Sequence, residues 1–139
     1  MSIVVTAFVA AILSVLGTFL MEKTAVMTSV FGGFLRLTLS KNPGVAFGLS
    51  LPYPLQEILI AIALLTMLAF ACKTRQNRFS SLGFGLILGG AIGNLIDRIP
   101  DGLVTDYFAV GTFPVFNIAD ACITVGAGML ILESLRKKQ

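Results

Sequence analysis

Two aspartates, Asp106 and Asp120, are the residues of this sequence best suited to chemistry. Asp120 falls about one turn into an apolar segment, and a carboxylate within a membrane span costs roughly 2.5 to 3.5 kcal/mol, so it needs a partner, water or a task. Two carboxyls that share one site repel each other, so one holds a proton while the other remains a base. Such a pair can activate water and polarise a peptide carbonyl, which is aspartic-protease chemistry.

Amide and charged side chains accompany the two aspartates. Asn94, Asp97 and Arg98 occupy positions i, i+3 and i+4, which lie on one face of a helix. Asn117 and Asp120 have the same three-residue spacing at the start of the last apolar segment. We expect the amides and Arg98 to hold a substrate backbone or a developing oxyanion.

Most of these polar residues also have a purely structural interpretation. Asp97 and Arg98 would suit an interfacial ion pair or the C-terminal anchor of a helix. Asn117 is well placed as the N-cap of the helix that follows it. The segment 42–44, which reads Asn-Pro-Gly, would suit an ordinary turn. The residue types by themselves leave both interpretations open.

The remaining composition excludes several other classes of function. The chain has no His, and Cys72 and Cys122 are its two cysteines, so it can form neither a zinc tetrad nor a Ser/His or Cys/His nucleophile pair. No run of Lys and Arg is interleaved with aromatic residues, as nucleic-acid binding would require. We therefore expect no metal, no cofactor and no nucleic-acid partner.

The elements that must position these residues are membrane spans. Of the 139 residues, 56% are hydrophobic and 12% are charged, and the mean hydropathy is +0.93; soluble domains carry roughly 25% charged residues. A span needs about 20 predominantly apolar residues. We expect an all-α polytopic membrane protein whose single domain occupies residues 1–139, with spans over 3–21, 55–72, 82–99 and 118–135. A cleaved signal peptide is the less favoured alternative for the first segment, because no basic flank precedes it.

The basic residues predict the orientation of these spans. Six of the ten basic residues lie between the second and third spans or at the end of the chain: Lys73, Arg75, Arg78, Arg136, Lys137 and Lys138. Because Lys and Arg in short loops stay on the cytoplasmic side, both termini are expected there. Asp106 and Asp120 then lie near the outer face.

The segment between the first two spans predicts a small β-hairpin on the outer surface. Residues 34–40 alternate between apolar and polar, with Leu35, Leu37 and Leu39 on one face, and a glycine pair at 32–33 precedes them. A second β-turn is predicted around Gly111. Glycines in the last two spans predict close packing with neighbouring helices: Gly85, Gly89, Gly93, Gly126 and Gly128.

Four motifs in the sequence resemble those of the lipoprotein signal peptidases, also called signal peptidase II. They are NPGVAFGL at 42–49, GGAIGNLIDRI at 89–99, GLVTDYF at 102–108 and FNIADACITVG at 116–126. The motifs occur in the order and with the four-helix pattern of that family. The resemblance covers the chain from about Asn42 to its end and also includes the pattern of spans before it.

The resemblance implies a membrane aspartic endopeptidase of the bacterial cytoplasmic membrane, with its site near the periplasmic face. Such an enzyme cleaves the signal peptide of a diacylglyceryl-modified prolipoprotein just N-terminal to the lipidated Cys, and it works among membrane lipids. The catalytic pair falls by motif on Asp106 and Asp120. The positions that line the pocket or support the pair are Asn42, Gly44, Asn94, Asp97, Arg98, Asn117 and Ala119. A single four-helix unit contains every motif, so a monomer is expected.

The sequence departs from the family pattern at the end of the first span. The family usually carries an Asp in a DQxTK-like string there, whereas this chain reads GTFLMEKTAV with Glu22 as the nearby acid. The segment from Asp106 to Asn117 also looks short for the gating element that the family places there. Two alternatives stay open: a homologue that binds signal peptides without cleaving them, and a small proton-coupled carrier that uses Asp97, Asp106 and Asp120 as relay groups. A carrier usually shows internal repeats and charges near the midplane, and this sequence has neither.

Overall fold

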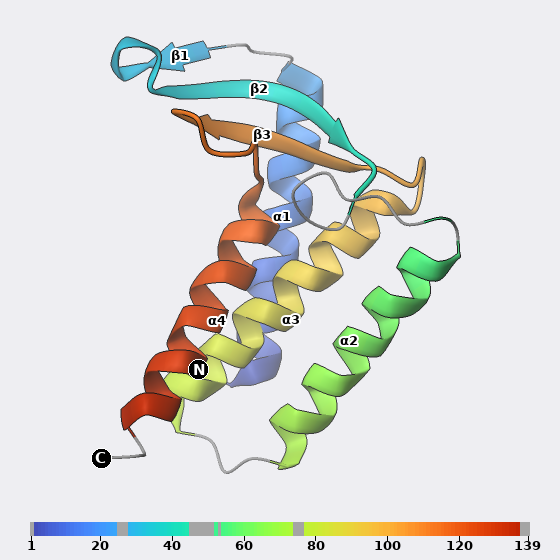
Figure 1. Ribbon diagram of the computed structural model, residues 1–139, viewed down its shortest axis with the longest axis vertical. Coiled ribbons are helices and arrows are strands. Elements are labelled where there is room, and N and C mark those ends of the chain that lie inside the picture. Colours follow the sequence, from blue (N-terminus) through green and yellow to red (C-terminus); the bar gives the residue numbers. More distant parts are fainter. Residues whose placement is uncertain (1, 25–27, 45–51, 53, 74–76, 137–139) are drawn as a thin grey trace.

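In the computed structural model, which describes residues 2–24, 28–44, 52, 54–73 and 77–136, four long helices carry a small sheet at one end (Figure 1). The helices are α1 (Ile3–Thr24), α2 (Leu55–Lys73), α3 (Arg78–Arg98) and α4 (Ile118–Arg136). They lie where the sequence predicted spans. By length and composition α1, α3 and α4 can each cross a membrane, and α2 contains the shorter apolar helix Ile58–Lys73.

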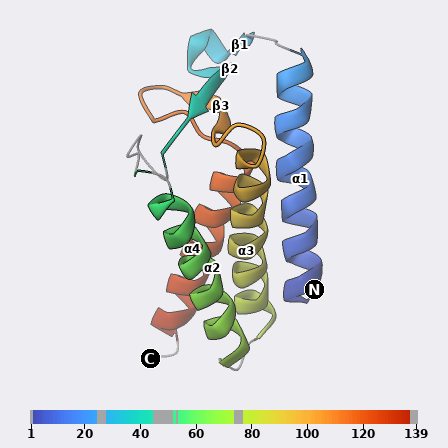
Figure 2. The ribbon, with the colours of Figure 1, turned by 90° about the vertical axis from the view of Figure 1, so that its right-hand side faces the viewer.

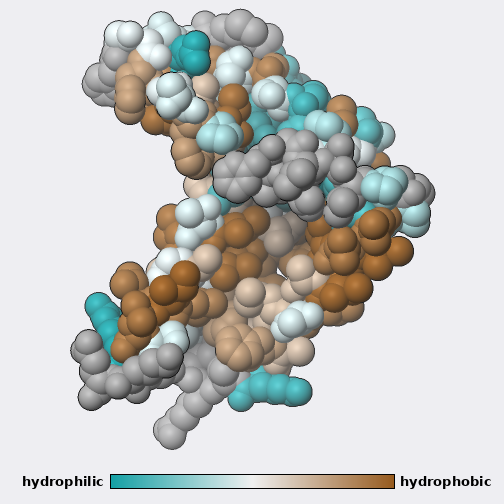
Figure 3. Space-filling model, in the orientation of Figure 1, coloured by the Kyte–Doolittle hydropathy of each residue, from teal (hydrophilic) through white to brown (hydrophobic). Residues whose placement is uncertain are grey.

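The surface of the helices is strongly apolar. Hydrophobic side chains cover the helical part of the molecule, and hydrophilic ones gather over the sheet and at the opposite end (Figure 3). Phe8 on α1 and Leu65 on α2 are each 66% exposed. Apolar surface on this scale is unfavourable in water and favourable in lipid. The exposure therefore agrees with a membrane protein.

Helix α3 lies at the centre and contacts the other three helices. Its glycines at 85, 89 and 93 all face α1, and a Cβ added at Gly89 would lie 2.3 Å from the carbonyl oxygen of Ala7. A side chain at any of these positions would force the two helices apart. The predicted glycine stripe is therefore a packing face, and its partner is α1.

A second set of glycines brings α3 against α4. A Cβ at Gly90 would lie 2.5 Å from the carbonyl oxygen of Ala119, and one at Gly126 would lie 2.6 Å from that of Gly83. Gly128, by contrast, faces open space, so the prediction that it allows close packing is wrong. The close approach of α3 and α4 sets the spacing of the polar residues at their outer ends.

The sheet has three antiparallel strands in the order β1 (Thr28–Val30), β2 (Leu35–Asn42) and β3 (Val104–Val110). The predicted hairpin between the first two spans is confirmed as β1 and β2. The predicted turn around Gly111 is also present, because Phe116 returns to pair with Phe108 of β3. An all-α description of the fold was incomplete, since the second outer segment adds the third strand.

A β-bulge in β2 changes which of its side chains share a face. Leu37 pairs with Phe108 and Ser40 pairs with Asp106, so two residues of β2 lie opposite Tyr107 alone. Beyond the bulge the alternation along β2 is inverted. The prediction that Leu39 shares a face with Leu35 and Leu37 is therefore wrong. Leu39 is 38% exposed, and Asn42 lies instead on the face that carries Asp106.

Strand β3 is held between α1 and α4 by Tyr107, which is 1% exposed. Its hydroxyl accepts a hydrogen bond of 3.3 Å from the backbone N–H of Ile118, the first residue of α4. A Cβ at Gly17 of α1 would lie 2.5 Å from the same hydroxyl, so only a glycine leaves room for it. Tyr107 therefore fixes the strand that carries Asp106.

Both helical ends of the chain lie away from the sheet. The start of α1 and the end of α4 are at the end of the helix bundle opposite to β1, β2 and β3 (Figure 2). The end of α2 and the start of α3 lie at that same end (Figure 1).

Candidate active site

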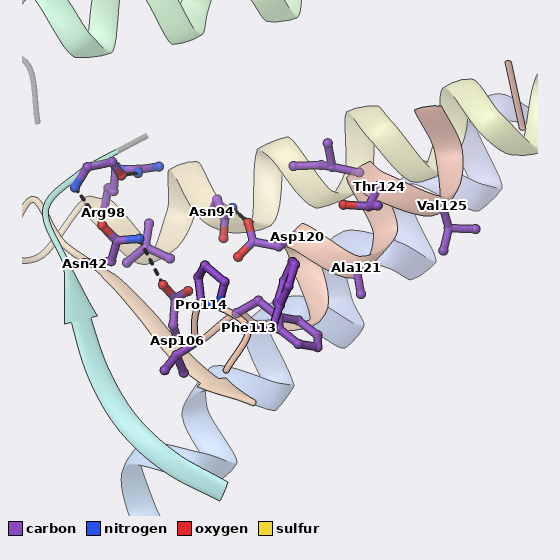
Figure 4. A pocket seen from close by; sticks show the side chains of 15 residues that line it. Asn42, Asn94, Arg98, Asp106, Phe113, Pro114, Asp120, Ala121, Thr124 and Val125 are labelled. Carbon is purple, nitrogen blue, oxygen red and sulfur yellow. Dashed lines mark hydrogen bonds between the residues drawn. The ribbon is translucent and has the colours of Figure 1, made fainter. Parts of the chain in front are cut away.

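The two aspartates come from different elements that meet beneath the sheet. Asp106 lies in the middle of β3 and is 2% exposed, and Asp120 lies half-buried in the first turn of α4. The segment 113–117, which precedes α4, brings the start of this helix back to β3. Figure 4 shows both carboxyl groups beside the same cavity.

Asn117 contacts both aspartates. Its Oδ1 accepts a hydrogen bond of 2.9 Å from the backbone N–H of Asp120, and Asp120 Oδ2 accepts one of 3.3 Å from the backbone N–H of Asn117. This reciprocal pair is a capping box at the start of α4. Asn117 Nδ2 also donates a 2.9 Å bond to Asp106 Oδ1. Asn117 therefore both caps α4 and contacts the two aspartates.

Two further amides hold the other carboxylate oxygens. Asn94 Nδ2 donates to Asp120 Oδ1 at 2.9 Å, and Asn94 Oδ1 accepts from Asn117 Nδ2 at 3.0 Å. Asn42 Nδ2 donates to Asp106 Oδ2 at 3.0 Å. Each carboxyl is thus held in place at both of its oxygens, which fixes its orientation toward the cavity.

Asn42 is itself held by a short chain of contacts. Its Oδ1 accepts a 2.8 Å bond from the backbone N–H of Gly44, and the guanidinium of Arg98 donates to the carbonyl oxygen of Gly44. Gln56, which is 3% exposed in the first turn of α2, donates a 3.0 Å bond to the carbonyl oxygen of Pro43. Sequence reasoning missed Gln56, although a polar residue at the start of an apolar helix was the available signal. The rest of the NPGVAFGL motif lies outside the described residues.

Asp97 and Ala119 do not line the cavity. Asp97 Oδ2 accepts a 2.6 Å bond from the backbone N–H of Thr105, the residue before Asp106 in β3. Ala119 is 1% exposed and lies against Gly90. Asp97 supports the strand, and the small side chain of Ala119 permits the contact between α3 and α4.

Glu22 occupies the region where the sequence departs from the resembled family. Its Oε1 accepts a 2.7 Å bond from Lys41 Nζ and a 3.1 Å bond from Thr105 Oγ1, so it ties the end of α1 to β2 and β3. Lys41 also reaches Asp101 at 3.2 Å. Sequence reasoning missed Thr105, whose type and position gave no signal of this role.

A cavity of about 530 Å³ opens beside the aspartates and extends along α4 (Figure 4). We call it the first cavity. Asn42, Asn94, Arg98, Asp106 and Asp120 form its polar end. The remaining lining is mostly apolar: Gly44, Val104, Phe113, Pro114, Val115, Phe116, Ala121, Ile123, Thr124 and Val125. Sequence reasoning treated the segment 113–116 only as a flank of the turn at Gly111 and missed its part in the cavity.

Burial, together with a smaller contribution from repulsion by Asp120, raises the pKa of Asp106 to about 6. The hydrogen bonds from Asn42 and Asn117 favour the carboxylate and oppose this rise. The Asp106 carboxyl therefore keeps its proton into the weakly acidic range. Asp120 lies in the first turn of α4, where its two carboxylate oxygens accept hydrogen bonds from Asn94 and from the backbone N–H of Asn117.

The arrangement supports acid–base chemistry on a substrate in the first cavity. Among the described residues there is no group of three or more His, Cys, Asp or Glu side chains that could hold a metal ion. A protonated carboxyl and an ionised one beside an apolar cavity can polarise a carbonyl and activate water.

Comparisons with known proteins point to one family. A family model described as signal peptidase (SPase) II matches residues 3–136. A lipoprotein signal peptidase of Halothermothrix orenii is 41% identical over 115 residues, which cover 81% of this chain and 79% of that protein. A lipoprotein signal peptidase of Chlorobium luteolum is 36% identical over 131 residues, which cover 84% of this chain and 78% of that protein.

Solved structures share the fold. A bacterial membrane enzyme determined at 2.3 Å resolution by the in meso method superimposes with a TM-score of 0.89 at 30% identity, covering 99% of this chain and 89% of that one. A second bacterial membrane enzyme, at 1.9 Å resolution, gives a TM-score of 0.85 at 30% identity, covering 96% and 92%.

Proposed function

This chain belongs to the signal peptidase II family of aspartic membrane endopeptidases, and we propose that Asp106 and Asp120 are the pair with which it cleaves lipoprotein signal peptides. The observation that carries the assignment is the set of hydrogen bonds from Asn42, Asn94 and Asn117 to the two carboxyls at the polar end of the first cavity. The substrate is a prolipoprotein whose Cys carries a diacylglyceryl group.

The two aspartates take different roles because their surroundings differ. Asp120 is the base: it lies at the N-terminus of α4 and its carboxylate accepts the backbone N–H of Asn117. Asp106 is the acid, since it lies in a strand interior and is 2% exposed. A pair that starts with one shared proton needs no other group to begin the reaction.

The reaction follows from these roles. Asp120 takes a proton from water as the water oxygen attacks the carbonyl carbon before the lipidated Cys, and Asp106 gives its proton to the carbonyl oxygen. The tetrahedral intermediate then returns that proton to Asp106 as the carbonyl re-forms. The proton on Asp120 passes to the leaving nitrogen as the C–N bond breaks. The lipidated Cys leaves with a free amino group, and the pair again holds one proton.

The asymmetry of basic residues supports an orientation with both termini in the cytoplasm. Lys73, Arg78 and Arg136 lie at the ends of α2, α3 and α4 that are remote from the sheet. Basic residues in short loops stay on the cytoplasmic side, which puts the sheet and the aspartates at the periplasmic face of the bacterial inner membrane. A lipid-anchored substrate reaches this depth by lateral diffusion, and one monomer carries every residue of the site.

The proposed activity is tested with the purified protein in detergent and a synthetic diacylglyceryl prolipoprotein peptide. We expect cleavage of the single bond before the lipidated Cys, identified by mass spectrometry of both products. The same peptide without its diacylglyceryl group should be cleaved poorly. Absence of cleavage of the lipidated peptide would contradict the proposed function.

A further inference from the structure

A second cavity meets the first at Asp106. It has a volume of about 340 Å³, and its lining residues are Ser40, Lys41, Asn42, Pro43, Asp106, Pro114 and Val115. The two cavities share Asn42, Asp106, Pro114 and Val115. A substrate chain at the aspartates can therefore extend in two directions, one into each cavity.

The two cavities differ in chemistry and in depth. The first continues along the apolar side chains of α4, such as Ala121 and Val125, toward the middle of the helix bundle. The second lies at the end of β2 and is therefore beside the sheet. Its polar groups come from Ser40, Lys41 and Asn42. An apolar signal peptide suits the first cavity, and a hydrophilic segment suits the second.

The second cavity lies along the last residues of β2. Ser40 and Asn42 lie on the face of the sheet that carries Asp106, and the second cavity covers this face at the end of β2, where Lys41 and Pro43 complete its wall. Within the described residues, β1 pairs with β2 only over Leu35–Leu37, which leaves the edge of β2 opposite to β3 without a strand partner from Thr38 onward. An extended peptide binds such an edge through its main chain.

We infer that the second cavity binds the first residues of the mature lipoprotein, those that follow the lipidated Cys, as an extended chain along β2. This inference rests on the proposed function and adds to it a binding site on the far side of the cleaved bond. Main-chain hydrogen bonding makes the site tolerant of sequence, as an enzyme with many substrates requires. The polar groups of Ser40, Lys41 and Asn42 favour polar side chains at the first mature positions.

The test compares two diacylglyceryl peptides, one amidated directly after the lipidated Cys and one extended by four mature residues. With the unmodified enzyme we expect about a tenfold higher kcat/KM for the extended peptide, mainly through KM. Equal kcat/KM values for the two peptides would overturn the inference without touching the proposed function. If neither peptide were cleaved, the proposed function itself would fail.

A matched pair of variants locates the effect. Ser40→Trp fills the second cavity and should remove the advantage of the extended peptide while the amidated peptide is still cleaved. Ser29→Trp places the same side chain on the exposed strand β1, outside both cavities, and should keep that advantage. An advantage that persists in Ser40→Trp would contradict the site. The comparison of the two peptides by the unmodified enzyme decides the question if Ser40→Trp does not fold.

Discussion

Replacing Asn117 separates its two structural roles. Its Oδ1 caps α4 through the backbone N–H of Asp120, and its Nδ2 donates to Asp106. Asn117→Ala removes both: the cap contributes about 1 kcal/mol, and leaving buried polar partners unsatisfied costs about 1 to 3 kcal/mol. The expected loss in the free energy of unfolding is therefore about 2 to 4 kcal/mol. Asn117→Ser keeps a capping oxygen but cannot reach Asp106, so it should lose about 1 kcal/mol less.

Turnover should respond differently from stability. Because neither Ala nor Ser at position 117 can donate to Asp106, both variants should lower kcat by at least about tenfold, which corresponds to 1.4 kcal/mol. Thermal unfolding in detergent, followed by circular dichroism at 222 nm, measures stability, and cleavage of the lipidated peptide measures kcat. Full activity in Asn117→Ser would refute the role of Nδ2. Equal stability of the Ala and Ser variants would refute the cap.

Three other predictions concern the pair, the helix packing and Arg98. The pKa of Asp106 is raised from 3.8 to about 6. This group therefore contributes up to about 3 kcal/mol to the free energy of unfolding below pH 4, and the contribution is lost as the pH rises through 6. Denaturation at pH 4 and pH 8 should show this loss in the unmodified protein and not in Asp106→Asn. Gly90→Ala should destabilise the protein by about 1 to 3 kcal/mol because its Cβ meets the Ala119 carbonyl, whereas Gly128→Ala, which faces open space, should leave the melting temperature unchanged or higher. Arg98→Ala removes the hydrogen bond to Gly44 and should weaken cleavage without abolishing it. Unchanged kinetics would mean that Arg98 serves only as an anchor at the end of α3.

The helices were predictable from the sequence because long apolar runs carry most of the information about spans. Their ends were less predictable. Helix α3 begins at Arg78, four residues before the predicted start at Leu82, because Asn77 caps it by accepting a hydrogen bond from the backbone N–H of Ser80. A count of apolar residues does not register a polar first turn.

The convergence of Asp106 and Asp120 on one cavity was predictable, because motif and chemistry coincide at these two residues. Contacts between distant segments were not predictable. The spacing of Asn94, Asp97 and Arg98 predicted one shared face, yet Asp97 turns to the backbone of β3 while the other two line the first cavity. An i, i+3 relation brings side chains near each other but does not decide which neighbour each one meets.

The sheet shows the same limit. The alternation of residues 34–40 predicted a strand, but no local pattern announces a β-bulge, because a bulge is a property of two paired strands. The bulge sets Asn42 on the face of Asp106 and exposes Leu39. The pairing of β2 with β3 likewise joins segments more than sixty residues apart, for example Ser40 with Asp106.

The most direct test of the catalytic pair is the turnover of Asp106→Asn and Asp120→Asn on the diacylglyceryl peptide. Asp101→Asn is the matched control, because Asp101 is an exposed carboxyl near the same end of the molecule that lines neither cavity. If Asp106 and Asp120 are the catalytic pair, Asp106→Asn and Asp120→Asn each fold but lose at least about a hundredfold in kcat. The control Asp101→Asn retains its activity. Turnover close to that of the unmodified enzyme in either Asp106→Asn or Asp120→Asn would contradict the pair.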